Sequence, residues 1–313
     1  MKTREIQIGG LHLGGSNGLF LIAGPCVIES AEACRAAARQ VQEAAQTARI
    51  PLIFKASFDK ANRSAGTSFR GLPGDARERM KEGLAVLRAI RKELDLPVLT
   101  DIHETWQAEP AAEVVDIIQI PALLCRQSDL LVAAGQTGKA VNVKKGQFLA
   151  PGDMRNIVDK IKSTDNEDIL LTERGTSFGY HYLVNDMRSL PAMRLLGYPV
   201  VYDATHSVQL PGGRGDRSGG ERQFVPALAR AAVAAGVDGV FLEVHPDPDQ
   251  ALSDGPNMLR IADLPPLLHL LQRIDREVKA YIEAENFEVR PLRPGAGNTL
   301  LGAPPPKDAS PGG

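Results

Sequence analysis

The sequence is organised around one segment, PLIFKASFDKANRS, at residues 51–64. Its first four residues are apolar, which is typical of a strand that is buried on both faces of a parallel sheet. The following ten residues contain Lys55, Lys60 and Arg63, with an amide and two hydroxyl groups. Such a set can bind phosphate, so we expect a small, doubly charged anion here. A solvated surface turn rich in charges is the alternative.

Short apolar runs like the one at the start of this segment recur along the chain. The eight candidate strands cover residues 19–23, 52–54, 98–102, 117–120, 140–143, 169–171, 200–202 and 240–242. Patterns with helical periodicity follow them, at residues 30–49, 76–94, 106–115, 129–134, 154–161, 187–196, 225–235 and 264–284. Strict alternation predicts parallel strands joined by right-handed crossovers.

Eight such units close into a barrel of typically ~250 residues, so we expect a single (β/α)8 TIM barrel over residues 19–286. An open, doubly wound sheet is the alternative. It would carry a Gly-x-Gly-x-x-Gly turn after the first strand, whereas this strand ends in Gly24-Pro25-Cys26. Paired glycines within residues 1–18 predict a short hairpin without a functional role. The Pro- and Gly-rich residues 287–313 predict a disordered tail.

Composition excludes several classes of partner. The chain has 313 residues and a formal net charge of -2 at pH 7, which does not favour nucleic acid or a membrane surface. Its N-terminus lacks the apolar core of a signal peptide, so we expect a cytoplasmic protein. The three cysteines cannot all pair, and a reducing compartment would keep them as thiols. We expect Cys34 and Cys125 to be packing residues.

Polar or ligand-type residues stand at or just after nearly every candidate strand. They are Cys26, Lys55, Asp101, His103, Gln119, Lys144, Lys145, Glu173, Arg174, Asp203, His206, Glu243 and His245. In barrel enzymes the carboxyl ends of the strands form the active-site mouth. We therefore expect these groups to converge there and to serve catalysis.

Three of these residues, together with one from a following loop, could bind a metal ion. Cys26, His206 and Glu243 end strands one, seven and eight, which are adjacent in a closed barrel, and Asp254 lies in the loop after strand eight. Mixed sulfur, nitrogen and oxygen ligands favour one divalent transition metal ion, whether Zn²⁺, Fe²⁺, Mn²⁺ or Co²⁺. The alternative for Cys26 is a small buried residue.

A second, positive cluster is expected across the mouth from these ligands. Lys60, Lys144 and Arg174 would form it, and with Asn62, Arg63 and Ser64 they provide two phosphate-sized sites. Ion pairs at the rim with Asp59, Asp101 and Glu173 are the alternative for each cation, and we expect Lys145 to point elsewhere. The glycine-rich residues 209–220 are either a mobile lid or a flexible surface loop.

The residues collected so far resemble a known family, the 3-deoxy-D-manno-octulosonate 8-phosphate synthases, also called 2-dehydro-3-deoxyphosphooctonate aldolases. The resemblance covers about residues 21–254. Its most specific motifs are AGPC at 23–26, FKASFDKANRS at 54–64, QIPA at 119–122, NVKK at 142–145, DATH at 203–206 and HPDP at 245–248. It implies a barrel transferase that condenses phosphoenolpyruvate with D-arabinose 5-phosphate and water and releases phosphate, in lipopolysaccharide core sugar biosynthesis.

The resemblance also implies roles for individual residues. A cysteine at position 26 implies the metal-dependent class, with the ligands Cys26, His206, Glu243 and Asp254. Phosphoenolpyruvate would be held by Lys60, Lys144 and Arg174, in a pocket shaped by Gln119, Pro121 and Ala122. The sugar phosphate would lie along Lys55, Ser57, Asn62, Arg63 and Ser64. Asp101, His103 and Glu173 are candidates for proton transfer or for supporting the ligands, with His206 also counted as catalytic.

The resemblance further implies that Arg126 reaches the phosphate site of a neighbouring subunit, so we expect a homo-oligomer, specifically a homotetramer. The sequence departs from the family after Ser64, where Ala65-Gly66-Thr67-Ser68 replaces Ser-Ile-His-Ser. The segment at residues 71–77 also looks several residues longer than is usual in the family. Three other functions stay open. They are a 3-deoxy-D-arabino-heptulosonate 7-phosphate synthase using erythrose 4-phosphate, an aldolase with a Schiff base on Lys144, and a phosphosugar-binding protein without activity.

Overall fold

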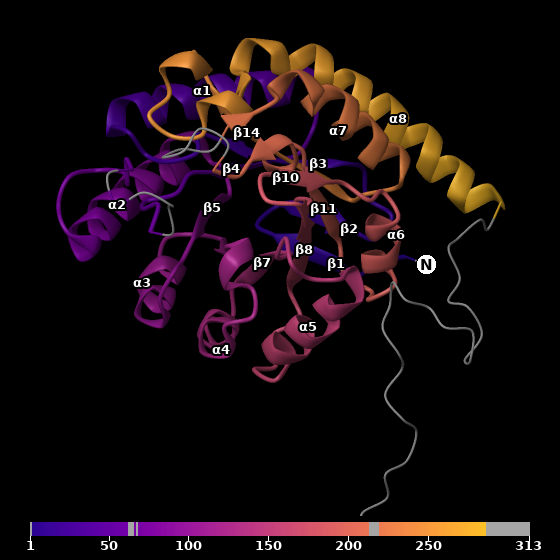
Figure 1. Ribbon diagram of the computed structural model, residues 1–313, viewed down its shortest axis with the longest axis horizontal. Coiled ribbons are helices and arrows are strands. Elements are labelled where there is room, and N and C mark those ends of the chain that lie inside the picture. Colours follow the sequence, from indigo (N-terminus) through magenta and orange to yellow (C-terminus); the bar gives the residue numbers. More distant parts are fainter. Residues whose placement is uncertain (1, 62–65, 67, 213–218, 286–313) are drawn as a thin grey trace, which may run out of the picture.

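The computed structural model describes residues 2–61, 66, 68–212 and 219–285 (Figure 1). Its central feature is a closed barrel of parallel strands. These are β3 (Phe20–Gly24), β4 (Leu52–Lys55), β5 (Val98–Asp101), β6 (Ile117–Ile120), β7 (Ala140–Lys144), β8 (Ile169–Glu173), β11 (Val200–Asp203) and β14 (Gly239–His245). Each strand pairs in parallel with the next, and β14 pairs with both β11 and β3, which closes the ring. The predicted (β/α)8 barrel is confirmed.

An outer layer of helices surrounds the strands (Figure 1). They are α1 (Ala31–Ala48), α2 (Ala76–Leu94), α3 (Ala108–Ala112), α4 (Ser128–Gln136), α5 (Met154–Lys162), α6 (Ser189–Arg194), α7 (Val225–Ala234) and α8 (Leu264–Glu285). Local sequence sets several ends. Ser30 caps α1 by accepting from the backbone N–H of Ala33, and Asp75 and Glu78 form a reciprocal capping box on α2.

Two helices, α3 and α6, are at least four residues shorter than the sequence predicts. The segment expected as 106–115 consists of a 3-10 turn, Thr105–Gln107, followed by α3. Pro110 lies in that segment, where it has no N–H to donate to an α-helical hydrogen bond. The segment expected as 187–196 begins at Ser189, which leaves Pro191 in the first turn of α6, where proline is tolerated.

The N-terminal hairpin is confirmed as β1 (Glu5–Ile8) paired antiparallel with β2 (Leu11–Gly14). Its apolar side chains are part of the barrel interior. Ile6 and Leu13 are fully buried and belong to one core cluster with Phe20 and Phe241, which project inward from β3 and β14. The hairpin therefore plugs one end of the barrel, a role that its sequence did not predict.

The fold also contains short strands outside the barrel. A hairpin of β9 (Thr176–Phe178) and β10 (Tyr182–Val184) follows β8, and β15 (Leu259–Arg260) pairs in parallel with the end of β14. The strands β12 (Gln209–Leu210) and β13 (Gly219–Gly220) pair antiparallel at the base of the glycine-rich loop. Residues 213–218, which belong to the expected lid, lie outside the described residues, as does the predicted tail.

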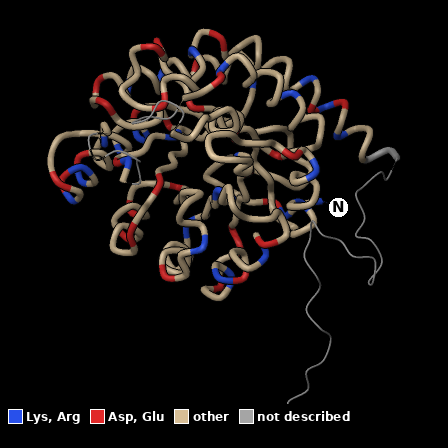
Figure 2. The backbone as a smooth tube through the Cα atoms, in the orientation of Figure 1, with Lys and Arg blue, Asp and Glu red and all other residues tan. Residues whose placement is uncertain are grey.

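Along the helices, the Lys and Arg positions are intermixed with the Asp and Glu positions (Figure 2). This distribution agrees with a formal net charge near zero. Within the part of the chain that the structure describes, none of the helices has the length and apolar character needed to cross a bilayer.

Candidate active site

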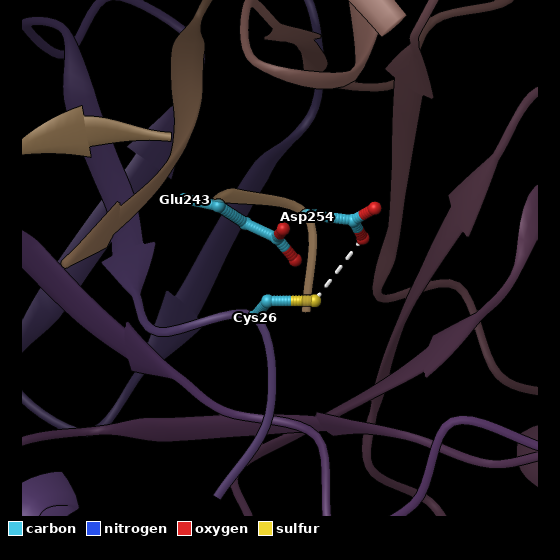
Figure 3. Close-up of side chains that lie close together, drawn as sticks. All are labelled: Cys26, Glu243 and Asp254. Atoms are coloured by element: carbon cyan, nitrogen blue, oxygen red, sulfur yellow. Dashed lines mark hydrogen bonds between the residues drawn. The ribbon is translucent and has the colours of Figure 1, made fainter. Parts of the chain in front are cut away.

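Three potential metal ligands meet at the carboxyl ends of the barrel strands. The Sγ atom of Cys26 and one carboxylate oxygen each of Glu243 and Asp254 all lie within 4.8 Å of one another (Figure 3). Cys26 Sγ is 3.2 Å from Asp254 Oδ2 and 3.3 Å from Ser253 Oγ. Cys26 and Glu243 are buried, whereas Asp254 is partly exposed. One thiol and two carboxylates at this spacing match the donor set of a divalent transition metal ion.

Backbone geometry brings these ligands together. Gly24 pairs with Glu243 across β3 and β14, which places Cys26 just beyond the end of that ladder. A Cβ at Gly24 would lie 2.0 Å from the backbone oxygen of Lys55, so the close approach of β3 and β4 requires glycine. Asp254 has a φ of 52°, in the left-handed region. Arg222 holds the loop by donating to Gly255 O at 2.9 Å.

His206 stands beside this group of three. Its Nε2 is 3.6 Å from Glu243 Oε2, and its Nδ1 is 2.7 Å from Asp203 Oδ2. A carboxylate that accepts the Nδ1 proton leaves the Nε2 lone pair available to a metal, which is the usual support of a metal-binding histidine. The fourth predicted ligand therefore lies beside the group, although it is not one of the three mutually close donors.

The expected separation between a metal half and a cationic half does not hold. Lys55 Nζ is fully buried and donates to Glu243 Oε1 at 2.7 Å and to Cys26 O at 2.9 Å. Lys60 Nζ lies 3.7 Å from the same Glu243 oxygen. The two signs interleave because buried ionised groups require nearby opposite charges. Burial alone would raise the pKa of Glu243, but Lys55, His206 and Lys60 hold it well below its ordinary value.

A second buried ion pair joins Lys144 to Asp203, across strands β7 and β11. Burial lowers the pKa of Lys144, and the charge of Asp203 partly offsets this effect. Burial likewise disfavours the Asp203 carboxylate, but His206 and Lys144 outweigh it and lower the pKa of Asp203. Asp203 thus links the predicted anion-binding Lys144 to the predicted metal ligand His206. The sequence placed Asp203 at a strand end without assigning it this role.

Arg174 provides a further buried cation at the end of β8. Its Nη2 donates to Gln209 Oε1 at 2.8 Å, while Nη1 has no hydrogen-bond partner among the described residues. Burial lowers the pKa of the Arg174 guanidinium, and the charges of Asp203 and Asp254 oppose that shift. A buried guanidinium with an unsatisfied N–H group is suited to receive an anionic ligand.

Lys145 contacts the loops after β7 and β8, in agreement with the prediction that it points elsewhere. Its Nζ donates to the backbone oxygens of Gly146 and Leu149, and lies 3.5 Å from Glu173 Oε1. Glu173 in turn accepts from the backbone N–H groups of Arg174 and Gly175. The pair therefore organises the loops after β7 and β8, including the segment that carries Arg174.

Asp101 and its neighbours form a third polar group. Ser57 donates its hydroxyl to Asp101 Oδ1, and His103 Nε2 is 3.2 Å from Asp101 Oδ2. Burial opposes ionisation of Asp101, but the adjacent His103 and the charges of Lys60 and Lys55 lower its pKa. Asp101 is therefore an ionised hydrogen-bond acceptor near neutral pH.

The remaining predicted residues lie along the same mouth or outside the described part of the chain. Gln119 is buried and accepts from Asn142 Nδ2 at 3.0 Å, and Pro121 precedes the 3-10 turn Ala122–Leu124. Arg126 is exposed just beyond that turn. Asn62, Arg63 and Ser64 lie outside the described residues, so their predicted sugar-phosphate contacts remain predictions. Gln209, which contacts Arg174, carried no functional signal beyond its place before a glycine-rich run.

The other two cysteines are buried and free. Burial raises the pKa of the Cys34 thiol to about 12, and it also raises the pKa of Cys125. Both side chains belong to the main core cluster. Their expected role in packing is confirmed.

The barrel and its mouth, with cations and metal-type ligands interleaved, define a TIM-barrel enzyme that is built for a small anionic substrate. The chain belongs to the DAHP synthetase I family, whose sequence model it matches over residues 3–280.

Individual relatives are more specific. The chain is 61% identical over 273 residues to the 2-dehydro-3-deoxyphosphooctonate aldolase of Citrifermentans bemidjiense, a match that covers 87% of this chain and 98% of that protein. It is also 61% identical over 277 residues to the protein of the same name from Geobacter metallireducens, covering 88% of this chain and 100% of that protein. A third relative of that name, from Geobacter sp. strain M21, is 60% identical over 273 residues, covering 87% and 98% of the two chains.

Proposed function

We propose that this protein condenses phosphoenolpyruvate with D-arabinose 5-phosphate and water, forming 3-deoxy-D-manno-octulosonate 8-phosphate and inorganic phosphate. The observation that carries this proposal is the contact between the cationic and metal-type groups. Lys60 lies 3.7 Å from Glu243, whose carboxylate also belongs to the group of Cys26 and Asp254. A phosphorylated substrate held by the cations would therefore place its reacting carbons beside the metal-type ligands.

Phosphoenolpyruvate is the anion that we assign to the cationic part of the mouth. Lys60, Lys144 and Arg174 would hold its phosphate and carboxylate, and Arg174 Nη1 is the N–H group left to receive them. These residues would position C3 of phosphoenolpyruvate against the sugar aldehyde and stabilise charge as it redistributes. Gln119, Pro121 and Ala122 would shape the pocket around this substrate.

In this reaction C3 of phosphoenolpyruvate forms a bond to the aldehyde carbon, and water adds at C2. The aldehyde oxygen takes a proton and becomes a hydroxyl group. The bond between C2 and the bridging phosphate oxygen then breaks, phosphate leaves with that oxygen and with the proton of the new C2 hydroxyl group, and C2 becomes the ketone carbon of the product. Asp101 and His103, with the Ser57 hydroxyl beside them, are the groups that we assign to orient the sugar and its protons. Lys55, which is paired with Glu243, would contribute to the sugar site.

One divalent transition metal ion would be held by Cys26, Glu243 and Asp254, with His206 as a fourth ligand. When bound, such an ion supplies Lewis acidity that orients or acidifies a water or a sugar hydroxyl group. Asp203 would keep His206 turned with Nε2 toward the ion. The metal-dependent class of the family is part of this proposal, and the ion is Zn²⁺, Fe²⁺, Mn²⁺ or Co²⁺.

The experiment is an assay of phosphate release from phosphoenolpyruvate and D-arabinose 5-phosphate, with and without a chelator. We expect release in the native enzyme, loss after metal removal, and recovery when Zn²⁺, Fe²⁺, Mn²⁺ or Co²⁺ is returned. Absence of release with both substrates and metal present would contradict the proposed reaction. Unchanged turnover after complete metal removal would contradict the metal assignment alone.

A second candidate substrate is erythrose 4-phosphate, because the matched family is named for DAHP synthetase. The relatives at 60% identity or above favour arabinose 5-phosphate. Competition between the two aldehydes in the same assay separates the candidates. We expect arabinose 5-phosphate to be consumed and erythrose 4-phosphate to be left.

An exposed apolar surface supports a homo-oligomer. Phe178, Tyr180 and Tyr182 on the β9–β10 hairpin are 68%, 97% and 54% exposed, and Phe148 is 54% exposed. The backbone N–H of Ser177 donates to Gln147 O at 2.9 Å, which brings Phe148 close to the hairpin. Contiguous exposed aromatic groups mark interaction surfaces. We propose that this surface joins copies of the chain in a homotetramer, with Arg126 reaching a neighbouring mouth, and that the enzyme works in the cytoplasm.

A further inference from the structure

Gln209 lies between Arg174 and Asp254 and contacts both. The proposed function assigns Arg174 to phosphoenolpyruvate and Asp254 to a metal ion. Gln209 Oε1 accepts from Arg174 Nη2 at 2.8 Å, and Gln209 Nε2 donates to Asp254 Oδ1 at 3.3 Å. The other oxygen of Asp254 lies 3.2 Å from Cys26 Sγ. A continuous polar chain therefore runs from the anion-binding guanidinium through one amide to two of the metal-type ligands.

An amide has the polarity that this position needs. A guanidinium offers only donors, and an ionised carboxylate offers only acceptors. The neutral Gln209 side chain presents an acceptor to the first and a donor to the second at the same time. A carboxylate or an ammonium group in its place would satisfy one neighbour and repel the other.

The backbone around Gln209 fixes where this amide lies. Gln209 pairs with Gly220 in the β12–β13 ladder, and the Glu221 N–H donates to Val208 O at 3.0 Å. The residue is 9% exposed, so water has little access to replace its contacts. Because Asp254 lies on a separate loop with left-handed backbone, the amide ties together segments that are 35 and 45 residues from it in sequence.

We infer that Gln209 is a positioning residue that holds the Arg174 guanidinium and the Asp254 carboxylate in a common frame. Its contact with Nη2 leaves Nη1 of Arg174 directed to an anion, and its contact with Oδ1 leaves Oδ2 of Asp254 beside the Cys26 thiol. The inference rests on the proposed function, since that function assigns phosphoenolpyruvate to the first end and a metal ion to the second.

The test uses Gln209→Met, which keeps the length of the side chain and removes both hydrogen bonds. Co²⁺ binding to the metal-free protein is followed by visible absorption, including the thiolate charge-transfer band. Phosphoenolpyruvate binding to the metal-free protein is followed by calorimetry. We expect each affinity to fall about tenfold, since hydrogen bonds to charged groups are involved. Gln272→Met is the matched control, because Gln272 on α8 contacts only the backbone oxygen of Arg49 among the hydrogen bonds described. Its affinities should equal those of the native chain.

A second measurement separates positioning from a general structural effect. In an Asp254→Ala background, Gln209→Met should cause no further loss of Co²⁺ affinity, because the carboxylate that it orients is already gone. It should still weaken phosphoenolpyruvate binding about tenfold. Unchanged affinities in Gln209→Met, or an equal further loss of Co²⁺ affinity in the Asp254→Ala background, would overturn the inference.

These outcomes are distinct from failure of the proposed function. Both affinities are measured without turnover, so they do not depend on the identity of the sugar. If the native chain does not bind phosphoenolpyruvate, the proposed function fails at its first substrate. The Co²⁺ measurements then still decide whether Gln209 orients Asp254.

Discussion

Lys55 and Glu243 form a fully buried ion pair at 2.7 Å, between the ends of two strands that flank β3. Lys55→Met would leave the Glu243 carboxylate in the core without its closest cation. Removal of one partner of a buried pair costs about 3 kcal/mol or more. We expect a decrease of that size in the free energy of unfolding of the metal-free protein, measured in urea at pH 7.

The matched control for this variant is Arg188→Met, because Arg188 also pairs with an aspartate but lies on the surface. Its free energy of unfolding should equal that of the native chain within error. If Lys55→Met has the same free energy of unfolding as Arg188→Met, the buried pair does not stabilise the fold.

Cys26→Ser tests the metal site directly. Serine keeps the size of the side chain but replaces the thiolate, which is the soft donor of the proposed set. We expect Co²⁺ affinity to fall at least about tenfold and the thiolate charge-transfer band to vanish. Cys34→Ala is the control, since Cys34 is a buried thiol in the core and should leave both measurements unchanged. A charge-transfer band that survives in Cys26→Ser would place the metal elsewhere.

Asp101→Asn should change the dependence of stability on pH. The pKa of Asp101 is lowered in the folded protein from its ordinary value of 3.8, so ionised Asp101 stabilises the fold above that pH and loses this effect as the pH falls. We expect Asp101→Asn to be less stable by about 2 kcal/mol at pH 7, as for hydrogen bonds to a charged group. The difference in free energy of unfolding between the native chain and Asp101→Asn should become smaller below pH 3.8. Urea unfolding between pH 3 and 7 measures it. A difference that is constant throughout would exclude this linkage.

Gly24→Ala should destabilise the barrel at the metal-type ligands. The added Cβ would meet the backbone oxygen of Lys55 at 2.0 Å, and backbone atoms of two paired strands have little room to move. We expect the free energy of unfolding to fall by about 2 kcal/mol, as for overpacking of a core, and urea unfolding measures this decrease. Gly18→Ala is the control, because a Cβ there would have no neighbour within 4 Å among the described residues.

Phe178→Asp should weaken the proposed assembly. Phe178 on the β9–β10 hairpin is 68% exposed, so a charge there opposes burial against another copy without disturbing the core. We expect light scattering to give the mass of a tetramer for the native chain and a smaller mass for the variant. Arg188→Met is again a suitable control. A native chain that scatters as a monomer at micromolar concentration would contradict the proposed assembly.

The regular part of the fold was predictable because its local signals agree with its tertiary role. The strand at Ile117–Ile120 and the helix Ala76–Leu94 match their predicted bounds, since an apolar run and a capping box mark them directly. The β9–β10 hairpin escaped prediction, because Thr176–Phe178 is exposed throughout and has no burial alternation. The plugging role of the N-terminal hairpin depends on long-range packing that periodicity does not encode.

The site was predictable to the level of strand ends. Parallel strands bring their carboxyl ends to one mouth, which is why Cys26 and Glu243 could be paired over more than two hundred positions. The interleaving of Lys60 with Glu243 depends on side-chain torsions, which the strand order does not determine. The position of Gln209 depends on loop conformation, so no sequence rule led to it.

The β1–β2 hairpin determines how substrates enter the enzyme and how products leave it. With Ile6 and Leu13 filling the base of the barrel, both substrates and both products must use the opposite opening. Phosphate and the eight-carbon sugar therefore depart along the route by which their precursors arrived. A ligand that covers this opening blocks entry and exit together.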